Sequence, residues 1–297
     1  MNCVTEKISQ NNIIVNNSLH VKEETTNVLN CDDLDKFILG LNNILGEGKF
    51  TIRELIDEAG KRGLKKYWKN LKTIDDVLLV FGANKTHDKG LCGKILEYAL
   101  FGNKPNSDPN PDLDNNGDIK TNKWGKLKKS GGYRSTERIK IGSAGNTDNW
   151  SSFDHILNSS NITELKKYDK MSCGVIPLIE RVKNSCSTLE GALNLRILYV
   201  AKYDLGKSNY IDALNEDLEN IKEKLRNKEA SQKGQKYLHL HTQGAGRGKN
   251  ASRALGYTLK FVTILVAETI ARDKKISIDS VLIANGRSLY INPTILN

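Results

Sequence analysis

Three stretches in the first third of the chain carry apolar residues at the three-and-four spacing of an amphipathic helix. Residues 32–44 and 51–62 each place an apolar stripe on one face and charged residues on the other. In the second stretch Thr51 stands at the N-cap position, and Glu54 three residues later completes a capping box. The third stretch, 73–81, is mostly apolar, so its pattern predicts either a helix or a buried strand.

Residues 86–101 predict a further helix, with Asp88 as its N-cap. Lys89 falls in the first turn, where the helix dipole disfavours a cation. A lysine is better placed there if a phosphate binds at the helix start. Glu97 lies two turns later on the polar side. Each of the two residues is also compatible with an ordinary solvated surface.

Period-two alternation predicts several strands, which fall on both sides of the middle of the chain. In residues 118–121 the alternation puts Ile119 on one face and both Asp118 and Lys120 on the other. Residues 137–141 read as a second strand beside the first. The remaining expectations are buried elements at 175–182 and 193–203, a loop at 124–133, a strand at 237–241, helices at 212–226 and 252–272, and closing strands at 277–283 and 288–296.

These elements predict one mixed α/β domain over residues 32–297, with helices flanking a mixed β-sheet. Residues 1–31 are polar and asparagine-rich and predict a flexible tail. Within the domain, residues 32–160 carry the N-terminal helices and the main candidate chemistry. Residues 161–297 supply the rest of the core.

Charge and cysteine content narrow the function classes. The 45 Lys and Arg residues exceed the 35 Asp and Glu residues, for a net charge of +10, which suits a protein that binds a polyanion. The five cysteines are scattered, so neither a disulfide framework nor a zinc site is supported. The longest apolar run, 261–267, is too short to cross a membrane. We therefore expect a cytoplasmic protein without a membrane partner.

The strongest candidate chemistry lies in residues 107–121, where Asp112 and Asp118 precede Lys120. Carboxylate oxygens are the protein ligands that Mg²⁺ prefers, with Mn²⁺ as a possible substitute. A metal held there can lower the pKa of a bound water and polarise a phosphodiester. Lys120 can then orient the water or stabilise charge on the phosphate. The ordinary alternative is an acidic surface hairpin with a solvated lysine.

A glycine-rich basic loop follows the strand at 237–241. It contains Arg247 and Lys249, and it lacks the lysine and hydroxyl spacing of a P-loop. His241 and Gln243 lead into this loop, and both residue types can contact base edges, since Gln pairs bidentately with adenine. His239 shares a strand face with His241. The pair can also be read as metal ligands, although the sequence offers no third ligand.

Taken together, these segments resemble the MutH mismatch-repair nickase and the related type II restriction endonucleases that cut at GATC. The family's lysine-glycine helix start, with a glutamate eight residues after the lysine, is similar to Lys89–Gly93 and Glu97. Its aspartate followed by G-V-E-L-K-T, a PD-(D/E)xK site, is similar to Asp112 and Gly117–Thr121. The resemblance covers about residues 45–297 and is more specific in the catalytic segment than in the C-terminal half.

The C-terminal half is similar to the restriction branch of this family, in its Y-L-x-x-x-T-K-G-A strand at 237–245 and in a tyrosine on the final strand, here Tyr290. Three positions depart from the pattern. Asp118 replaces a glutamate and shortens that ligand arm. The gap from Asp112 is one residue shorter, so Asp114 can compete as the ligand. Gln243 stands where a base-reading lysine is usual, which weakens any transfer of GATC specificity.

The resemblance implies a PD-(D/E)xK core with two arms around a DNA-binding cleft, and a Mg²⁺-dependent endonuclease acting on double-stranded DNA. A homodimer and a monomer acting twice are the two ways in which such an enzyme can cut both strands. Asp112 and Asp118 would bind the metal, with Lys120 beside the attacking water and Glu97 hydrogen-bonded to Lys120 or to a bound water. The residues expected to contact DNA are Lys89, His241, Gln243, Arg247, Lys249 and Tyr290. Two other functions stay open: a strand-nicking mismatch-repair enzyme and a DNA-binding module without catalysis.

Overall fold

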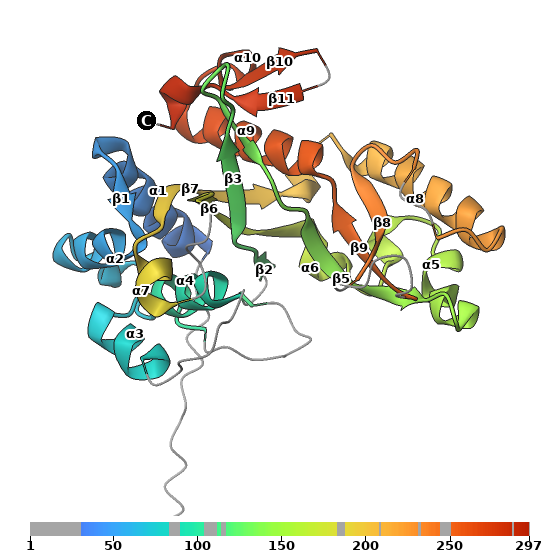
Figure 1. Ribbon diagram of the computed structural model, residues 1–297, viewed down its shortest axis with the longest axis horizontal. Coiled ribbons are helices and arrows are strands. Elements are labelled where there is room, and N and C mark those ends of the chain that lie inside the picture. The colour runs from blue at the N-terminus through green and yellow to red at the C-terminus, as the bar shows by residue number, and fades with distance from the viewer. Residues whose placement is uncertain are drawn as a thin grey trace, which may run out of the picture.

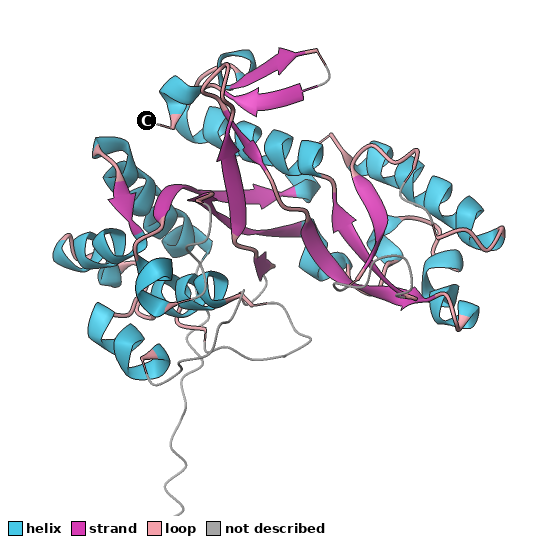
Figure 2. Cartoon of the chain, viewed as in Figure 1, coloured by secondary structure: helices cyan, strands magenta, loops and turns pink. Residues whose placement is uncertain are grey.

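The computed structural model describes residues 31–82, 90–103, 112–113, 117–182, 188–207, 209–230, 233–243, 251–286 and 288–296. These residues form two β-sheets with helices packed around them (Figures 1 and 2). The chain therefore has the mixed α/β architecture that its pattern predicts. Within the ranges just given, no helix is both long enough and apolar enough to cross a membrane. The predicted tail at 1–31 lies almost wholly outside them.

The larger sheet has eight strands and mixes parallel with antiparallel pairing. Its order is β1 (Phe50–Thr51), β7 (Arg196–Asp204), β6 (Cys173–Glu180), β3 (Asn122–Lys126), β4 (Tyr133–Ser135), β11 (Ser288–Ile291) and β10 (Leu282–Asn285). β2 (Asp118–Ile119) pairs in parallel with the start of β6, and β3 pairs in parallel with its end. Residues 118–126 thus follow one edge of β6, with a break between the two strands at Lys120 and Thr121.

Helices cover both faces of this sheet (Figure 2). Those on one face are α1 (Cys31–Glu47), α2 (Ile52–Lys61), α3 (Ile74–Phe81), α4 (Leu91–Phe101) and α7 (Leu189–Leu193). α9 (Leu259–Lys274) lies on the other face, and α8 (Ile211–Arg226) shares its core but packs against β8 (Leu238–Thr242). The hydrophobic core on the side of α1, the first core, contains Ile119 and Val175 from the sheet. The core on the side of α9, the second core, contains Ile176 and Leu178. Because neighbouring residues of β6 enter opposite cores, the sheet is the middle layer.

A second sheet of three antiparallel strands lies beside the main one. Its order is β5 (Ile139–Asn146), β9 (Ser252–Tyr257) and β8 (Leu238–Thr242). Alternation sends Leu240 and Tyr257 into the second core, so His239 and His241 fall on the opposite face of β8. The short helices α5 (Asp154–Leu157), α6 (Tyr168–Ser172) and α10 (Ile278–Val281) complete the described α-helices.

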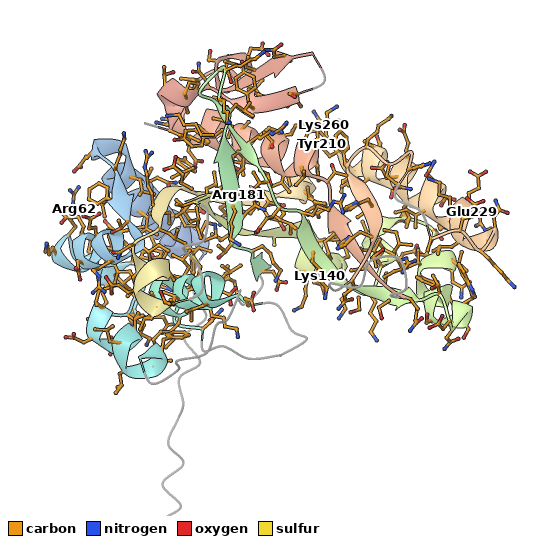
Figure 3. The ribbon with its side chains drawn as sticks, viewed as in Figure 1. Arg62, Lys140, Arg181, Tyr210, Glu229 and Lys260 are labelled. Carbon is orange, nitrogen blue, oxygen red and sulfur yellow. The ribbon has the colours of Figure 1, made fainter. Side chains whose placement is uncertain are left out.

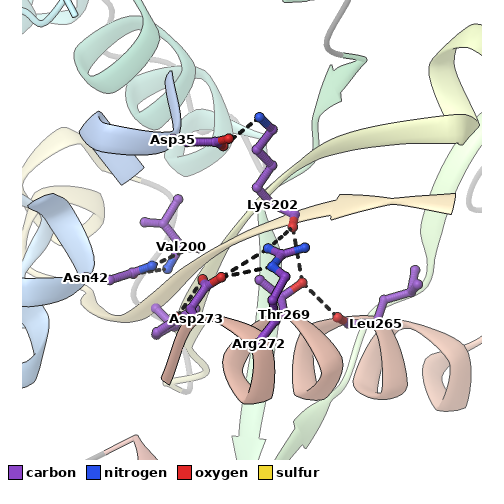
Figure 4. Close-up of polar contacts among 9 residues, drawn as sticks. Asp35, Asn42, Val200, Lys202, Leu265, Thr269, Arg272 and Asp273 are labelled. Atoms are coloured by element: carbon purple, nitrogen blue, oxygen red, sulfur yellow. Dashed lines mark hydrogen bonds and ion pairs between the residues drawn. The ribbon is translucent and has the colours of Figure 1, made fainter. Parts of the chain in front are cut away.

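Polar contacts tie the central strand β7 to helices on both sides (Figure 4). Asn42 on α1 makes two 2.9 Å hydrogen bonds with the backbone of Val200, one as donor and one as acceptor. From α9, Thr269 Oγ1 and Arg272 Nη2 both donate to the carbonyl oxygen of Lys202. These backbone groups of Val200 and Lys202 therefore have partners, and the contacts hold α1 and α9 against β7.

The structure confirms the locally encoded elements. Thr51 caps α2 in a complete capping box with Glu54, and Thr73 caps α3, which settles residues 74–81 as helix. The helix predicted at 212–226 is α8, with one face buried, and the elements expected at 175–182 and 193–203 correspond to the buried strands β6 and β7. In each case the signal lies within a few consecutive residues, so tertiary contacts reinforce it.

Four expectations about elements are wrong in whole or in part. The loop expected over 124–133 is confirmed for 127–132. Its ends belong to β3 and β4, because Trp124 is fully buried and pairs across the main sheet. The strand expected beside residues 118–121 is β5, which pairs instead with β9. The helix expected over 252–272 begins only at Leu259, because 252–257 pair with strands on both sides. Part of the closing strand at 277–283 is the helix α10.

Candidate active site

β2 places Asp118 and Lys120 on the same side of the chain. Ile119 between them is fully buried in the first core, so its neighbours face away from that core. Lys120 Nζ lies 2.7 Å from Asp118 Oδ2. The backbone of Lys120 is fixed as well, since its N–H donates to the carbonyl oxygen of Val175 at 2.9 Å. The predicted pairing of this carboxylate with this ammonium is present.

Asp112 folds back onto the same group. Its Oδ2 accepts a hydrogen bond from the backbone N–H of Ile119 at 3.0 Å and lies 3.8 Å from Lys120 Nζ. Its own N–H donates to Asp118 Oδ1 at 3.2 Å. A bridge between Leu113 and Gly117 closes this short hairpin. The six-residue spacing therefore still brings both carboxylates together, while Asp114 lies outside the described residues.

Gly117 makes this closure possible. Its φ is +79°, a left-handed conformation that favours glycine. A Cβ at this position would collide with the carbonyl oxygen of Cys173. The hairpin can therefore press against β6 only because residue 117 has no side chain.

Glu97 on α4 joins the acidic cluster. The helix approaches closely at Gly93, where a Cβ would lie 3.9 Å from Glu97 Oε1 and 3.6 Å from Thr121 Oγ1. Burial raises the pKa of Glu97 to about 7, and the negative charge of Asp112 adds to this rise. α4 begins at Leu91 with Gly90 as its N-cap, so Asp88 as the cap was a wrong prediction.

Lys170 is a fourth charged neighbour that sequence reasoning missed. It lies on α6, three residues before β6, and its Nζ is 3.5 Å from Asp118 Oδ1. The Asp118 side chain is only 1% exposed. An ammonium group lies near each of its carboxylate oxygens, that of Lys120 near Oδ2 and that of Lys170 near Oδ1. No motif of the chain points to Lys170, because its proximity to Asp118 arises from the pairing of β2 with β6.

The donor set suits a hard divalent cation. Asp118 Oδ2 is buried and has no hydrogen-bond partner; its 2.7 Å contact with Lys120 is an ion pair only. Asp112 and Asp118 offer carboxylate oxygens side by side, and Mg²⁺ characteristically takes one or two carboxylates plus waters and substrate phosphate. Among the described residues no three His, Cys, Asp or Glu side chains are grouped to enclose a metal.

The predicted DNA-binding residues do not all meet. Lys89, Arg247 and Lys249 lie outside the described residues. His241 is on β8, and Gln243 follows it, where its side chain accepts a hydrogen bond from Ser143 at 3.1 Å. Tyr290 is on β11 in the other sheet, 7% exposed and packed over Gly132. Figure 1 separates β11 from β8 along the molecule, so Tyr290 is not part of one surface with His241 and Gln243.

The two histidines of β8 stack face to face. The ring centroids of His239 and His241 are 4.8 Å apart, with an interplanar angle of 26°. Burial lowers the pKa of His239 to about 3 and that of His241 to about 4. Neighbouring positive charge contributes to both of these low pKa values, so both rings are neutral at pH 7.

Positive residues connect the histidines with the acidic cluster. Arg138 and Lys140 are both exposed at the start of the β5 segment, and both depress the pKa of His241. Burial and the charge of Lys120 lower the pKa of Lys140. Lys140 lies between β2 and β8 in the view of Figure 3. The acidic cluster and the histidines are thus neighbours across one basic stretch.

No protein-family model matches this chain, and no curated protein shows significant similarity to it. The resemblance to MutH and the GATC-cutting endonucleases therefore stays a prediction. What can be argued about function depends on the geometry above.

Proposed function

We propose that this chain is a Mg²⁺-dependent, sequence-specific endonuclease of the type II restriction kind, which hydrolyses phosphodiester bonds in double-stranded DNA. The observation that carries the proposal is the convergence of Asp112, Asp118 and Lys120, with Glu97 in electrostatic reach. Two carboxylates and an ammonium at one edge of a mixed sheet are the groups that metal-assisted phosphodiester hydrolysis requires. The net charge of +10 favours a polyanionic substrate.

Each side chain has a role set by its position. Asp112 and Asp118 would hold Mg²⁺, or Mn²⁺ in its place, which would polarise the phosphodiester and supply a water of lowered pKa. The Lys120 ammonium, between both carboxylates, is placed to orient the attacking water or to stabilise negative charge on the phosphate. Glu97, with its raised pKa, can exchange a proton with that water near neutral pH.

The fold assignment that accompanies this function is a PD-(D/E)xK core with a DNA-binding cleft between two arms. The support is threefold: a mixed sheet between two helical layers, a catalytic hairpin at the edge of its central strand, and a separate three-stranded sheet beside it. In this assignment the end of β8, with His241 and Gln243, lies in the arm that contacts bases. Neutral imidazole and amide groups can each donate and accept hydrogen bonds there.

Plasmid cleavage tests the proposal. Supercoiled DNA is incubated with wild-type protein, Lys120→Ala and Lys260→Ala, each in Mg²⁺ and in EDTA, with DNA binding measured in parallel by gel shift. Lys260 is an exposed lysine on α9 and serves as the matched control (Figure 3). We expect the wild type and Lys260→Ala to cleave in Mg²⁺ only, and Lys120→Ala to bind but not cleave.

The products distinguish the alternatives. Linear product with constant ends identifies a restriction enzyme, whereas open circles without linear product identify a strand-nicking enzyme. If the wild type shifts DNA but neither it nor any variant cuts, the chain is a DNA-binding module. Duplex RNA digested in place of DNA would assign the site to a different substrate.

A further inference from the structure

The stacked histidines of β8 leave two buried ring nitrogens without partners. His239 is 3% exposed, and its Nε2 accepts and donates no hydrogen bond; the same is true of His241 Nδ1. Buried polar atoms in folded proteins are nearly always hydrogen-bonded, and exceptions mark strained or ligand-binding sites. An unpartnered nitrogen on a side chain this deeply buried therefore indicates a missing ligand.

The backbone beneath the rings is shaped to hold them. Gly256 on the central strand β9 pairs directly with His239. A Cβ at Gly256 would lie 2.9 Å from His241 Cε1 and 2.6 Å from the carbonyl oxygen of Ile139. The ring of His241 thus lies against bare backbone, and the strand on the far side of that backbone is β5, which carries Lys140 opposite Gly256.

The charged side chains that lower the pKa values of these rings are basic. Arg138 acts on both histidines, and Lys140 acts on His241. The charge of Lys120 in turn lowers the pKa of Lys140. Arg138 and Lys140 are exposed and so can reach a ligand in front of the sheet. Within the described part of the chain no carboxylate is among the groups that shift these two pKa values, and such a set of like charges favours an anion over a metal cation.

We propose that His239, His241, Arg138 and Lys140 form a phosphate-binding subsite on the histidine-bearing face of the three-stranded sheet. A phosphate oxyanion accepts hydrogen bonds from imidazole, guanidinium and ammonium donors together, which satisfies the orphaned ring nitrogens and balances the charge. The same charges repel a divalent metal, so the metal-ligand reading of the two histidines is set aside. The oxyanion can come from free phosphate or from a nucleic-acid backbone; the second source depends on the function proposed above.

Solution NMR of the full chain in EDTA tests the subsite directly. Inorganic phosphate is titrated while the imidazole nitrogen resonances of His239 and His241 are followed, with the exposed His155 as internal reference. We expect saturable shifts of the first two and none of the third. Bound phosphate also favours protonated imidazole, so the titration midpoint of His241 should move to higher pH. Phosphate that leaves both resonances unchanged overturns the proposal.

Charge-neutral variants identify the donors. Arg138→Gln and Lys140→Gln should each weaken phosphate binding about tenfold, the loss expected for one charge-assisted hydrogen bond, whereas Lys260→Gln should not. Equal affinities for Lys140→Gln and Lys260→Gln would contradict the assignment.

A second arm uses a short DNA duplex under the same metal-free conditions, where cleavage plays no part. If a backbone phosphate occupies the subsite, each variant lowers the salt dependence of DNA affinity by about one charge. If phosphate binding is lost and DNA binding is unchanged, the subsite stands and its ligand is a free phosphate. In that case the subsite does not contact bound DNA. The proposed catalytic role of the acidic cluster is then tested separately by the cleavage assay.

Discussion

The hairpin at β2 and the histidine-bearing face of the three-stranded sheet differ in the sign of the charge that shifts the pKa values of their buried groups. In the first, burial and neighbouring carboxylates raise the pKa of Glu97 to about 7. In the second, burial and neighbouring cations lower the pKa values of His239 and His241 to about 3 and 4. The physical causes are the same, and only the sign of the charge differs. Each cluster therefore favours a counter-ion: a cation at the hairpin and an anion on the sheet.

The two clusters also differ in how they are held. The hairpin is fixed by backbone hydrogen bonds within residues 112–120 and by contact with β6. The sheet face is assembled from β5 and β8, which lie about a hundred residues apart in the chain. Lys120 and Lys140 are the point at which the clusters interact. The proposed metal site and the proposed phosphate subsite would therefore lie side by side, an arrangement that suits a phosphodiester substrate.

The largest effect is expected from Asp118→Asn. The amide keeps the shape of the side chain but removes the buried charge that would hold the metal. We expect cleavage in Mg²⁺ to fall roughly a thousandfold, about 4 kcal/mol of transition-state stabilisation, with DNA binding retained. Initial rates on plasmid, with a denaturation curve for each protein, measure this. Asp212→Asn on the exposed start of α8 is the control; an equal loss there would refute the role of Asp118.

Gly117→Ala should break the acidic hairpin without touching its charges. The added methyl group clashes with the backbone of Cys173 and the φ of +79° is unfavourable for alanine. We expect a loss of about 2–4 kcal/mol in the free energy of unfolding, measured in urea. Gly46→Ala, on the exposed side of α1 with nothing within 4 Å of its new Cβ, should instead be neutral or slightly stabilising. Similar destabilisation of both would show that the close approach at 117 is unimportant.

His239→Gln should change how stability depends on pH. The folded-state pKa lies near 3, so below pH 6.5 the unfolded chain takes up a proton that the folded chain refuses. Wild-type stability is therefore lost as pH falls from 6.5, by up to about 1.4 kcal/mol per pH unit for one such imidazole. Urea midpoints between pH 7 and 4.5 should fall less steeply for His239→Gln. His155 is exposed on α5, and His155→Gln should keep the wild-type slope. Equal slopes for the wild type and both variants would contradict a buried, neutral imidazole at His239.

Glu97→Gln should also change how stability depends on pH, by a smaller amount and in the opposite direction to His239→Gln. Because the folded-state pKa is raised from 4.5 to about 7, the folded chain holds a proton that the unfolded chain releases in this range. Wild-type stability is then lost as pH rises through this window, and the loss persists above it. In EDTA the variant should gain about 1–2 kcal/mol over wild type at pH 8 after allowance for solvent screening, and nothing at pH 4.5. A gain independent of pH would instead indicate a packing effect.

Prediction from the pattern succeeded where a few consecutive residues contain the whole signal. The capping box of α2 and the alternation of Asp118, Ile119 and Lys120 are of this kind. It failed at residues 252–257, where the apolar spacing continues that of α9 although the backbone pairs with β5 and β8. Thr258, whose side chain caps α9, was the local signal for the true helix start.

The sequence by itself determined that Asp112, Asp118 and Lys120 share one short hairpin, because loop closure over six residues leaves little choice of partner. Only the tertiary structure decided that Lys170 stands beside Asp118 and that Lys140 faces the histidines of β8. These contacts depend on strand register between distant segments, and a shift of one residue would turn each side chain to the other face. Local spacing thus determined the positions of the two carboxylates and Lys120. Strand pairing determined the positions of Lys170 and Lys140.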